Sequence, residues 1–499
     1  MILGNATAEG TKAYMESFAD LQHCELGRTG LLVSQAGFGC YRVDVSVEEH
    51  RMALRKALQC GVNLIDTSAN YGDGGSEELV GAVLEEMIAA GEAGREQVVV
   101  VSKAGYLQGQ NYLLSQERKR EGRPFPDLVS YGPGLEHCIH PVFLADQLTR
   151  SLARLRMERL DVYLLHNPEY YLMAAKQENV PPETARAEYE RRLELAFRHL
   201  EREVEQGRIG CYGISSNTFP ARRDDVTFTS LEDVLALAEK VSAAHHFRVI
   251  QLPMNLVETG GMTEANQAGG KSVLELAVEN ELGVLINRPL NAIVGGRLVR
   301  LADGDAVPVD VASVQTQVER LAEAERSLKE KLLAAVLEDD QEREEAADKL
   351  SAGRLLQEHW RSFSSAEHWR EVQGQFLVPT VQTGIRKLLE SGKLTTAAAE
   401  WVEAYVDGVN GVLPEVTAYY QWKGAEQVRA ITSRAEAAAA DWAGAGRASH
   451  LALRALRSTQ GVSSVLVGMR RAAYVEDVIA ELKETVAIKP RRAEWEALS

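Results

Sequence analysis

Four side chains of types that can move protons occur in the first third of the sequence: Asp66, Tyr71, Lys103 and His166. A free tyrosine has a pKa of ~10 and is a poor acid at neutral pH. A lysine ammonium beside it would favour the phenolate and lower that pKa, and an aspartate would keep the lysine charged and in place. A histidine close by could donate a hydrogen bond to the same substrate oxygen. Together, such groups can stabilise the charge that develops on a carbonyl oxygen as hydride arrives at its carbon.

The elements that would position these side chains are short apolar runs separated by helical patterns. Asp66 ends one run, and Lys103 and His166 directly follow two others. Strict alternation of strand and helix demands a parallel sheet with both faces covered, and eight such units indicate a closed (β/α)8 TIM barrel. Because the carboxyl ends of barrel strands meet at one rim, we expect the four side chains to converge there. The predicted strands are Gln35–Cys40, Val62–Asp66, Val98–Ser102, Leu160–Leu165, Ile209–Ile214, Arg248–Leu252, Gly283–Ile286 and Val462–Val467.

Three segments fall outside this alternation. Leu26–Val33 predicts a short N-terminal hairpin at the floor of the barrel. Residues 104–140 predict a long loop, and loops of this length are often functional. Within that loop we expect His137–His140 to line the substrate mouth rather than to bind a metal. Residues 299–446 are rich in Ala, Glu, Arg and Leu and predict a large helical insertion before the eighth strand.

These segments divide the chain into three parts. Residues 22–298 would form barrel strands one to seven, residues 299–446 the insertion, and residues 447–499 the last strand, the last helix and a tail. Trp360 and Trp369 are expected in the core of the insertion. The insertion would cover the active site, contact a protein partner or mediate self-association, and the sequence leaves these alternatives open.

Composition excludes several classes of protein. The 499 residues are 45% hydrophobic and 25% charged, as in globular domains, and contain no apolar run of about 18 residues that would span a membrane. A net charge of −17 argues against a nucleic-acid-binding protein. The five cysteines are scattered without a C-x-x-C pair, so neither a disulfide scaffold nor a metal site is predicted. Met1–Asp20 lacks the apolar segment of a secretory signal, so a cytoplasmic location is expected.

The order of the motifs resembles the aldo/keto reductase superfamily over roughly residues 24–298 and 447–485. That resemblance implies a (β/α)8 barrel, a nicotinamide cofactor, and a catalytic role for Asp66, Tyr71, Lys103 and His166. The segments that carry it are Leu64–Gly72, Gly75–Glu78, Gly81, Ser102–Lys103, Leu160–Pro168, Gly213–Ser215, Gln251, Asn255, Arg288–Leu290 and Val467–Arg470.

The same resemblance implies a set of cofactor-binding residues. Ser215 and Gln251 match positions near the nicotinamide carboxamide, and either Ser216 or Asn217 stands for the family's asparagine. Arg288 occupies the region where the family often stacks an aromatic ring on the nicotinamide. Arg470 lies where the family binds the adenosine phosphate, which favours NADP(H) over NAD(H). The full set is Ser215, Ser216, Asn217, Gln251, Arg288, Pro289, Leu290, Gly296, Arg297, Gly468, Met469 and Arg470. Of these, Pro289, Leu290, Gly296 and Arg297 are expected in a loop that wraps the diphosphate.

We therefore expect an NAD(P)(H)-dependent oxidoreductase that transfers hydride between nicotinamide C4 and an aldehyde, ketone or alcohol. Tyr71 would act as general acid and base, Lys103 would tune it, Asp66 would anchor Lys103, and His166 would orient the carbonyl. The partners would be small molecules, with neither nucleic acid nor a membrane among them. The alternative is a cofactor-binding regulatory protein whose helical insertion contacts a partner.

Overall fold

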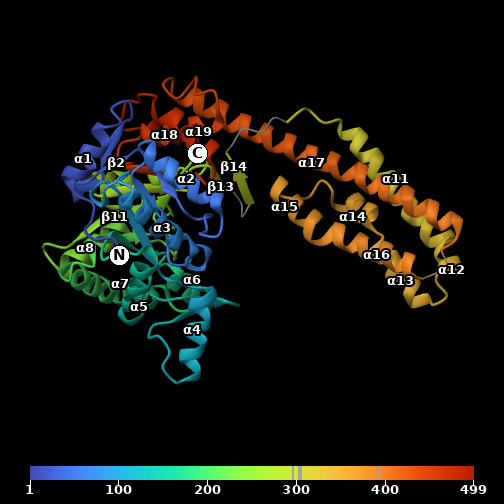
Figure 1. Ribbon diagram of the computed structural model, residues 1–499, viewed down its shortest axis with the longest axis horizontal. Helices are drawn as coiled ribbons and strands as arrows, with labels where there is room; N and C mark the ends of the chain where they lie inside the picture. The colour runs from blue at the N-terminus through green and yellow to red at the C-terminus, as the bar shows by residue number, and fades with distance from the viewer. Residues whose placement is uncertain (295–296, 302–305, 392–393) are drawn as a thin grey trace. The chain divides into compact units, whose positions relative to one another are not determined.

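The structure is a computed structural model that describes residues 1–294, 297–301, 306–391 and 394–499, with only the backbone of Val294 and Arg297 (Figure 1). It divides into two compact units. The barrel unit comprises Met1–Ala292 and Thr432–Ser499, and the helical unit comprises Ile293–Ile431. The helical unit thus begins before residue 299 and ends before residue 446.

The barrel unit is built on a closed barrel of eight parallel strands, which confirms the predicted fold class. All eight predicted strands form, and neighbouring strands follow one another around the barrel in chain order, with the last pairing with the first. This arrangement brings the carboxyl ends of all eight strands to one rim. The strands are β3 (Ala36–Gly39), β4 (Leu64–Asp66), β5 (Val99–Ala104), β9 (Leu160–His166), β10 (Ile209–Ser215), β11 (Phe247–Pro253), β12 (Gly283–Asn287) and β15 (Ser464–Val467).

Helices follow the strands and bury apolar stripes against them. α5 (Pro141–Leu155) shows why: Pro141 begins the helix, the His140 side chain accepts from the backbone N–H of Val142, and one face from Phe143 to Leu155 is buried. The other barrel helices are α2 (Glu48–Gln59), α3 (Gly75–Ala89), α7 (Pro182–Glu205), α8 (Leu231–Val241), α10 (Val273–Glu279), α18 (Ala448–Arg457) and α19 (Ala472–Leu482). Shorter or peripheral pieces are α1 (Ala8–Glu16), η2 (Tyr71–Gly74), η3 (Arg95–Gln97), α6 (Tyr170–Gln177), α9 (Gly260–Thr263), η4 (Ala268–Gly270) and α20 (Arg492–Glu496).

The predicted N-terminal hairpin closes the floor of the barrel. Its strands β1 (His23–Glu25) and β2 (Leu32–Ser34) pair around a 3-10 turn, η1 (Gly27–Thr29), so the first strand lies slightly earlier than expected. Leu26, Leu31 and Val33 join the buried cluster inside the barrel. Gly27 has a φ of +52°, and a Cβ there would lie 2.2 Å from the backbone nitrogen of Gly283, so only glycine fits.

Residues 104–140 are more ordered than the predicted long loop. They contain a helix, α4 (Gly109–Arg120), and a small antiparallel sheet in the order β6 (Tyr106–Leu107), β8 (Leu135–His137), β7 (Val129–Gly132). The expectation of an irregular loop was therefore wrong. α4 buries only Asn111 and Ser115, so its sequence has no apolar stripe from which a helix could be predicted.

The helical unit contains the predicted run of helices and begins within a two-stranded ribbon, in which β13 pairs with β14. α11 runs alongside α17, whose residues from Thr432 onward belong to the barrel unit (Figure 1). None of the helices in the described part of the chain is both long and apolar enough to cross a membrane. The elements are β13 (Asn291–Val294), β14 (Arg297–Arg300), α11 (Val311–Lys331), α12 (Leu333–Val336), α13 (Asp340–Lys349), α14 (Ala352–His359), α15 (Ala366–Glu371), the π-helix η5 (Val372–Leu377), α16 (Val378–Glu390) and α17 (Thr396–Ala438).

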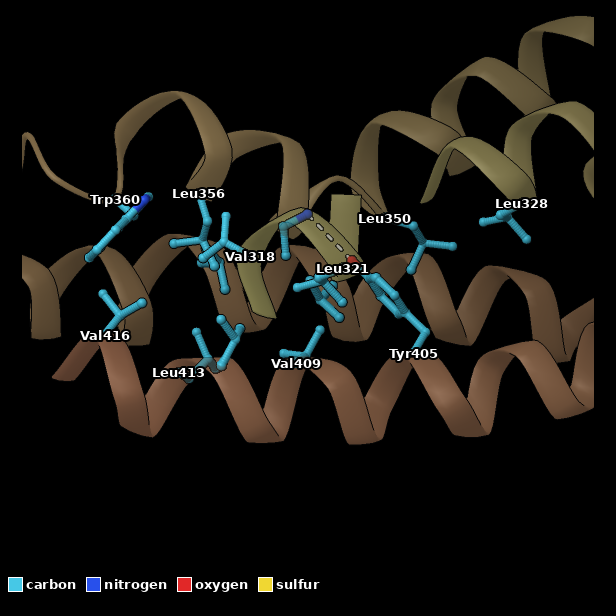
Figure 2. Close-up of a cluster of buried hydrophobic side chains, with 14 of the residues drawn as sticks. Val318, Leu321, Leu328, Leu350, Leu356, Trp360, Tyr405, Val409, Leu413 and Val416 are labelled. Atoms are coloured by element: carbon cyan, nitrogen blue, oxygen red, sulfur yellow. Dashed lines mark hydrogen bonds between the residues drawn. The ribbon is translucent and has the colours of Figure 1, made fainter. Parts of the chain in front are cut away.

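The helical unit has its own hydrophobic core. Tyr405, Val409, Leu413 and Val416 point from one face of α17 toward α11 and α14 (Figure 2). Their spacing of three and four residues places them on a single stripe of the helix. The predicted core tryptophans, Trp360 and Trp369, are 2% and 0% exposed, so that expectation is confirmed.

Candidate active site

The barrel brings the four predicted catalytic residues to one rim. Asp66 is the last residue of β4, and Tyr71 opens η2 directly beyond it. Lys103 lies near the end of β5, and His166 ends β9. β4, β5 and β9 are consecutive neighbours in the barrel, and Lys103 is in register with Leu164. Parallel pairing therefore places residues far apart in sequence within hydrogen-bond range.

Lys103 is held at the centre of this cluster. Its side chain is fully buried, and Nζ donates to Asp66 Oδ2 at 2.7 Å, to the carbonyl oxygen of Thr67 at 2.8 Å and to Tyr71 Oη at 3.4 Å. An ammonium has three hydrogens, so all of them are engaged. Burial opposes the charge on Lys103, but the adjacent Asp66 carboxylate and Tyr71 raise its pKa above the usual value. Lys103 therefore keeps its positive charge and is held in one position by its three hydrogen bonds.

The electrostatics of Tyr71 differ from the expected lowering of its pKa. Burial raises the pKa of Tyr71 to about 12, and the charge on Lys103 offsets only part of that rise. The expectation was wrong because it counted the lysine and omitted the removal of the phenol from water. At neutral pH Tyr71 keeps its proton, so it can donate a hydrogen bond.

His166 is neutral and held from both sides. Burial, followed by the charge on Lys103, keeps the pKa of His166 well below its usual range. Nδ1 lies 3.0 Å from Ser68 Oγ, which donates to Asn70 Oδ1 at 2.7 Å. The His166 carbonyl oxygen accepts from His137 Nε2 at 2.7 Å. Ser68 has one proton, so the direction of its hydrogen bonds determines which ring nitrogen of His166 carries hydrogen.

The stretch His137–His140 does not line a mouth as expected. His137 is 1% exposed and supports the backbone of His166, and Cys138 and Ile139 are also buried. Burial lowers the pKa of His137 to about 4, so it is uncharged at neutral pH. Among the residues that the structure describes, no group of three His, Cys, Asp or Glu is placed to hold a metal ion.

Two of the expected cofactor-binding residues connect directly to this cluster. Gln251 Nε2 donates to Asp66 Oδ1 at 2.9 Å, and Gln251 Oε1 accepts from Ser215 Oγ at 3.0 Å. Asn287 Nδ2 also approaches Gln251 Oε1, at 3.3 Å. These hydrogen bonds connect the Lys103–Asp66 pair to residues near the ends of β10, β11 and β12.

Ser216 and Asn217 have different surroundings. Ser216 is fully buried, and its hydroxyl lies within 3.2 Å of those of Thr218 and Thr229. The Asn217 side chain is exposed, while its backbone N–H donates to Glu169 Oε1 at 2.8 Å. Of the two positions, Asn217 offers an amide that a ligand can reach.

The segment after β12 differs from the expected diphosphate loop. Arg288 has a φ of +55° and forms an ion pair with Glu258 at 2.7 Å. Pro289 and Leu290 form a turn that leads into the ribbon of β13 and β14, instead of a continuous loop. Gly296 lies outside the described residues, and Arg297 is described by its backbone in β14 alone.

The remaining cofactor candidates connect β15 to α19. Gly468 is exposed, and a Cβ there would meet open space. Met469 is fully buried and anchors the connection. The half-buried Arg470 has no ion-pair partner within the described part of the chain, and it lies two residues before the first turn of α19.

Sequence reasoning missed Ser68, Asn287 and Tyr106 as parts of this site. The Tyr106 ring packs edge-on against His166 with centroids 4.7 Å apart, and its hydroxyl accepts from Asn167 Nδ2 at 2.7 Å. Ser68 and Asn287 could have been found from their positions, because they lie next to the ends of predicted strands. Nothing in the local sequence indicated Tyr106, whose strand β6 was not predicted.

Comparison with known proteins identifies the family of the chain. The sequence model described as the Aldo/keto reductase family matches residues 36–346. The NADH-specific methylglyoxal reductase of Escherichia coli is 27% identical over 28% of this chain and 40% of its own length. The NAD(P)H-dependent D-xylose reductase of Scheffersomyces stipitis is 26% identical over 38% and 50%. The L-glyceraldehyde 3-phosphate reductase of Escherichia coli is 28% identical over 40% and 47%. The chain thus spans about half, or less, of the curated relatives it matches.

Solved structures were also matched. An aldo/keto reductase from Klebsiella pneumoniae in complex with NADP and acetate is 20% identical with a TM-score of 0.33, over 53% of this chain and 67% of that one. The holo form of an aldo-keto reductase from Bacillus halodurans is 16% identical with a TM-score of 0.37, over 77% and 96%. The family match covers more than half of the chain, and the chain belongs to the aldo/keto reductase family.

Proposed function

We propose that the protein is an NAD(P)(H)-dependent oxidoreductase that reduces an aldehyde or ketone, or oxidises the corresponding alcohol. The observation that carries the proposal is the position of Tyr71 Oη, 3.4 Å from the ammonium of Lys103, which is itself held by Asp66. A protonated phenol beside a fixed cation is suited to stabilise negative charge on a substrate oxygen and to protonate it.

Each residue of the cluster has a distinct role in this proposal. Tyr71 donates its proton to the substrate oxygen, and Lys103 stabilises the phenolate that remains. Asp66 keeps Lys103 charged and in place, with Gln251 holding the other carboxylate oxygen. His166 orients the carbonyl by donating from Nε2, which requires the Ser68 hydroxyl to turn its proton from Asn70 Oδ1 to Nδ1 of His166. A bound reduced nicotinamide would supply the hydride.

The residues present fit a dinucleotide. Asn217 offers an exposed amide at the end of β10, and Gly468 leaves open space before α19. Arg470 is a cation without an ion-pair partner in the described part of the chain, next to a helix N-terminus, which suits a phosphate group. We propose NADP(H) as the preferred cofactor because Arg470 can bind a 2′-phosphate; the relatives include an NADH-specific reductase, and NAD(H) is the alternative.

We also propose that the helical unit is an insertion before the last barrel strand, as the sequence predicts for residues 299–446, with the bounds Ile293–Ile431 that the structure gives. The relatives named above act on small carbonyl compounds, and a small aldehyde or ketone is our proposed substrate class.

The test is steady-state loss of NADPH absorbance with a panel of aromatic, aliphatic and sugar aldehydes. Tyr71→Phe removes the proton donor and should lower turnover by about 10²–10⁴-fold, while NADPH affinity stays nearly unchanged. Tyr112→Phe is the matched control, because its phenol in α4 makes no hydrogen bond within the described part of the chain. Equal turnover in Tyr71→Phe and the parent would contradict the assignment. NADPH binding with no turnover on any substrate would favour the regulatory alternative.

A further inference from the structure

A hollow of about 260 Å³ opens at the floor of the barrel, at the end opposite to the candidate active site. Its walls come from the first residues of β9, β10 and β11 and from the turn η1 of the N-terminal hairpin. The floor of such barrels normally serves stability, and the loops at the other end carry the chemistry. A pocket lined by charged side chains at this end therefore requires a separate explanation.

Three arginines line the hollow: Arg28, Arg159 and Arg248. Within the described residues, none of them forms an ion pair with a carboxylate. Arg159 Nε is buried without a hydrogen-bond partner, and Arg248 reaches only the carbonyl oxygen of Phe247, at 3.4 Å. The chain has a net charge of −17, and other barrel arginines such as Arg154 are paired. Three arginines without a carboxylate partner in the described residues therefore line one hollow of an acidic chain.

The acidic groups nearby are already engaged. Asp161 lines the hollow, but its carboxylate accepts from Arg95 Nη2 at 2.8 Å and from the backbone N–H groups of Ala6 at 2.8 Å and Val100 at 2.7 Å. The buried Arg95 therefore balances its charge.

Glu201 is the second carboxylate close to the hollow. It is held by the Nδ1 and the backbone N–H of His246, each at 2.7 Å. Burial and the positive charge of Arg28 lower the pKa of Arg248, which agrees with two guanidinium groups facing each other. The three guanidinium groups thus have donors to offer and no carboxylate partner in the described chain to receive them.

We propose that this hollow binds a small polyvalent oxyanion, with phosphate as the recognised group. Arginine presents a planar fork of N–H donors that matches phosphate oxygens, and charge-assisted pairs of this kind are strong. Several arginines converging on one hollow suit a group with several anionic oxygens, such as a diphosphate or a small phosphorylated metabolite. The site is separate from the proposed cofactor site, which lies at the other end of the strands.

The experiment is a calorimetric titration of the full chain with inorganic pyrophosphate at constant ionic strength. It is made on the parent and on Arg159→Gln, Arg248→Gln and Arg223→Gln. Arg223 is the matched control: it is exposed, follows the carboxyl end of β10 and undergoes the same change of charge. A parallel titration contains saturating NADPH, and thermal unfolding of each protein is recorded with and without pyrophosphate.

We expect saturable binding of one pyrophosphate per chain, about tenfold weaker in Arg159→Gln and in Arg248→Gln and unchanged in Arg223→Gln or with NADPH. Because like charges repel, the two pocket variants should unfold no lower than the parent without the anion and gain less from adding it. The absence of saturable binding, equal binding in all proteins, or displacement by NADPH would each overturn the proposal. So would pocket variants that unfold lower without pyrophosphate but bind it as the parent does, because the arginines would then have a structural role.

Discussion

Ser68 Oγ lies 3.0 Å from Nδ1 of His166. In the sequence, Ser68 lies between the proposed catalytic residues Asp66 and Tyr71. The contact links the loop after β4 to the end of β9. Because His166 is neutral, its ring carries one hydrogen, and only Nε2–H can donate to a substrate held above the rim. The hydroxyl of Ser68 therefore acts on the chemistry through the tautomer of His166.

Replacing Ser68 tests this relationship. Ser68→Ala should lower kcat/KM by about tenfold, because the ring loses the hydrogen bond that selects its tautomer. The measurement is steady-state kinetics together with nitrogen NMR of the His166 ring, which distinguishes hydrogen on Nδ1 from hydrogen on Nε2. A slower enzyme with an unchanged ring spectrum would show that Ser68 acts only through packing.

Removing the counter-ion of Lys103 should affect both stability and turnover. Asp66→Asn keeps the size of the side chain but leaves a fully buried ammonium without a carboxylate, so burial lowers the pKa of Lys103. We expect the free energy of unfolding to fall by about 3–5 kcal/mol and turnover to be nearly lost. Urea unfolding and NADPH oxidation measure the two effects. Asp224→Asn, which breaks an exposed pair with Arg222, is the control and should change little.

The choice of cofactor can be tested at Arg470. Arg470→Ala should weaken NADPH binding by about tenfold and leave NADH binding almost unchanged, because only NADPH has the 2′-phosphate that a guanidinium can pair with. Fluorescence titration with each dinucleotide measures this difference. An equal loss for both dinucleotides would assign Arg470 to the shared part of the cofactor.

Glu169 makes stability depend on pH. Burial raises the pKa of Glu169 from 4.5 to about 7, and its Oε2 has no hydrogen-bond partner. The unfolded chain therefore loses this proton at lower pH than the folded chain does. The free energy of unfolding should fall by up to about 3 kcal/mol as the pH rises from 4.5 to 7 and then stay level.

Glu169→Gln isolates this contribution. The amide keeps an acceptor for the backbone N–H of Asn217 and does not titrate. The variant should therefore be more stable than the parent above pH 7, and the two should become alike below pH 4.5. Urea unfolding over this pH range gives the comparison, and a constant difference at all pH values would contradict the assignment.

The barrel was predictable because its strands are short apolar runs between helices. Val62–Asp66 and Leu160–Leu165 are buried on both faces, so most of their side chains are apolar and the segments are easy to recognise. The convergence of Asp66, Lys103 and His166 followed from the same pattern, because parallel strands bring their carboxyl ends to one rim. The residues near those strand ends could therefore be named without coordinates.

Other features could not be predicted because they depend on contacts between distant segments. The hydrogen bond from Gln251 to Asp66 joins β11 to β4 across the barrel. The sequence around each of the two residues does not indicate this contact. The helix α4 has no apolar stripe, so its order could not be recognised from periodicity. The pKa of Tyr71 also depended on burial, which a count of neighbouring charges omits.

The sequence by itself determined the strand and helix alternation, the rim residues and the tryptophan core of the helical unit, since each follows from local periodicity or from motif order. Only the tertiary structure decided which hydroxyl meets His166, that Asn217 is exposed while Ser216 is buried, and that Arg28, Arg159 and Arg248 share one hollow. The reason is physical. Hydrophobic patterning specifies which faces are buried, whereas hydrogen bonds, pKa values and unpaired charges depend on distances between segments that only the folded chain brings together.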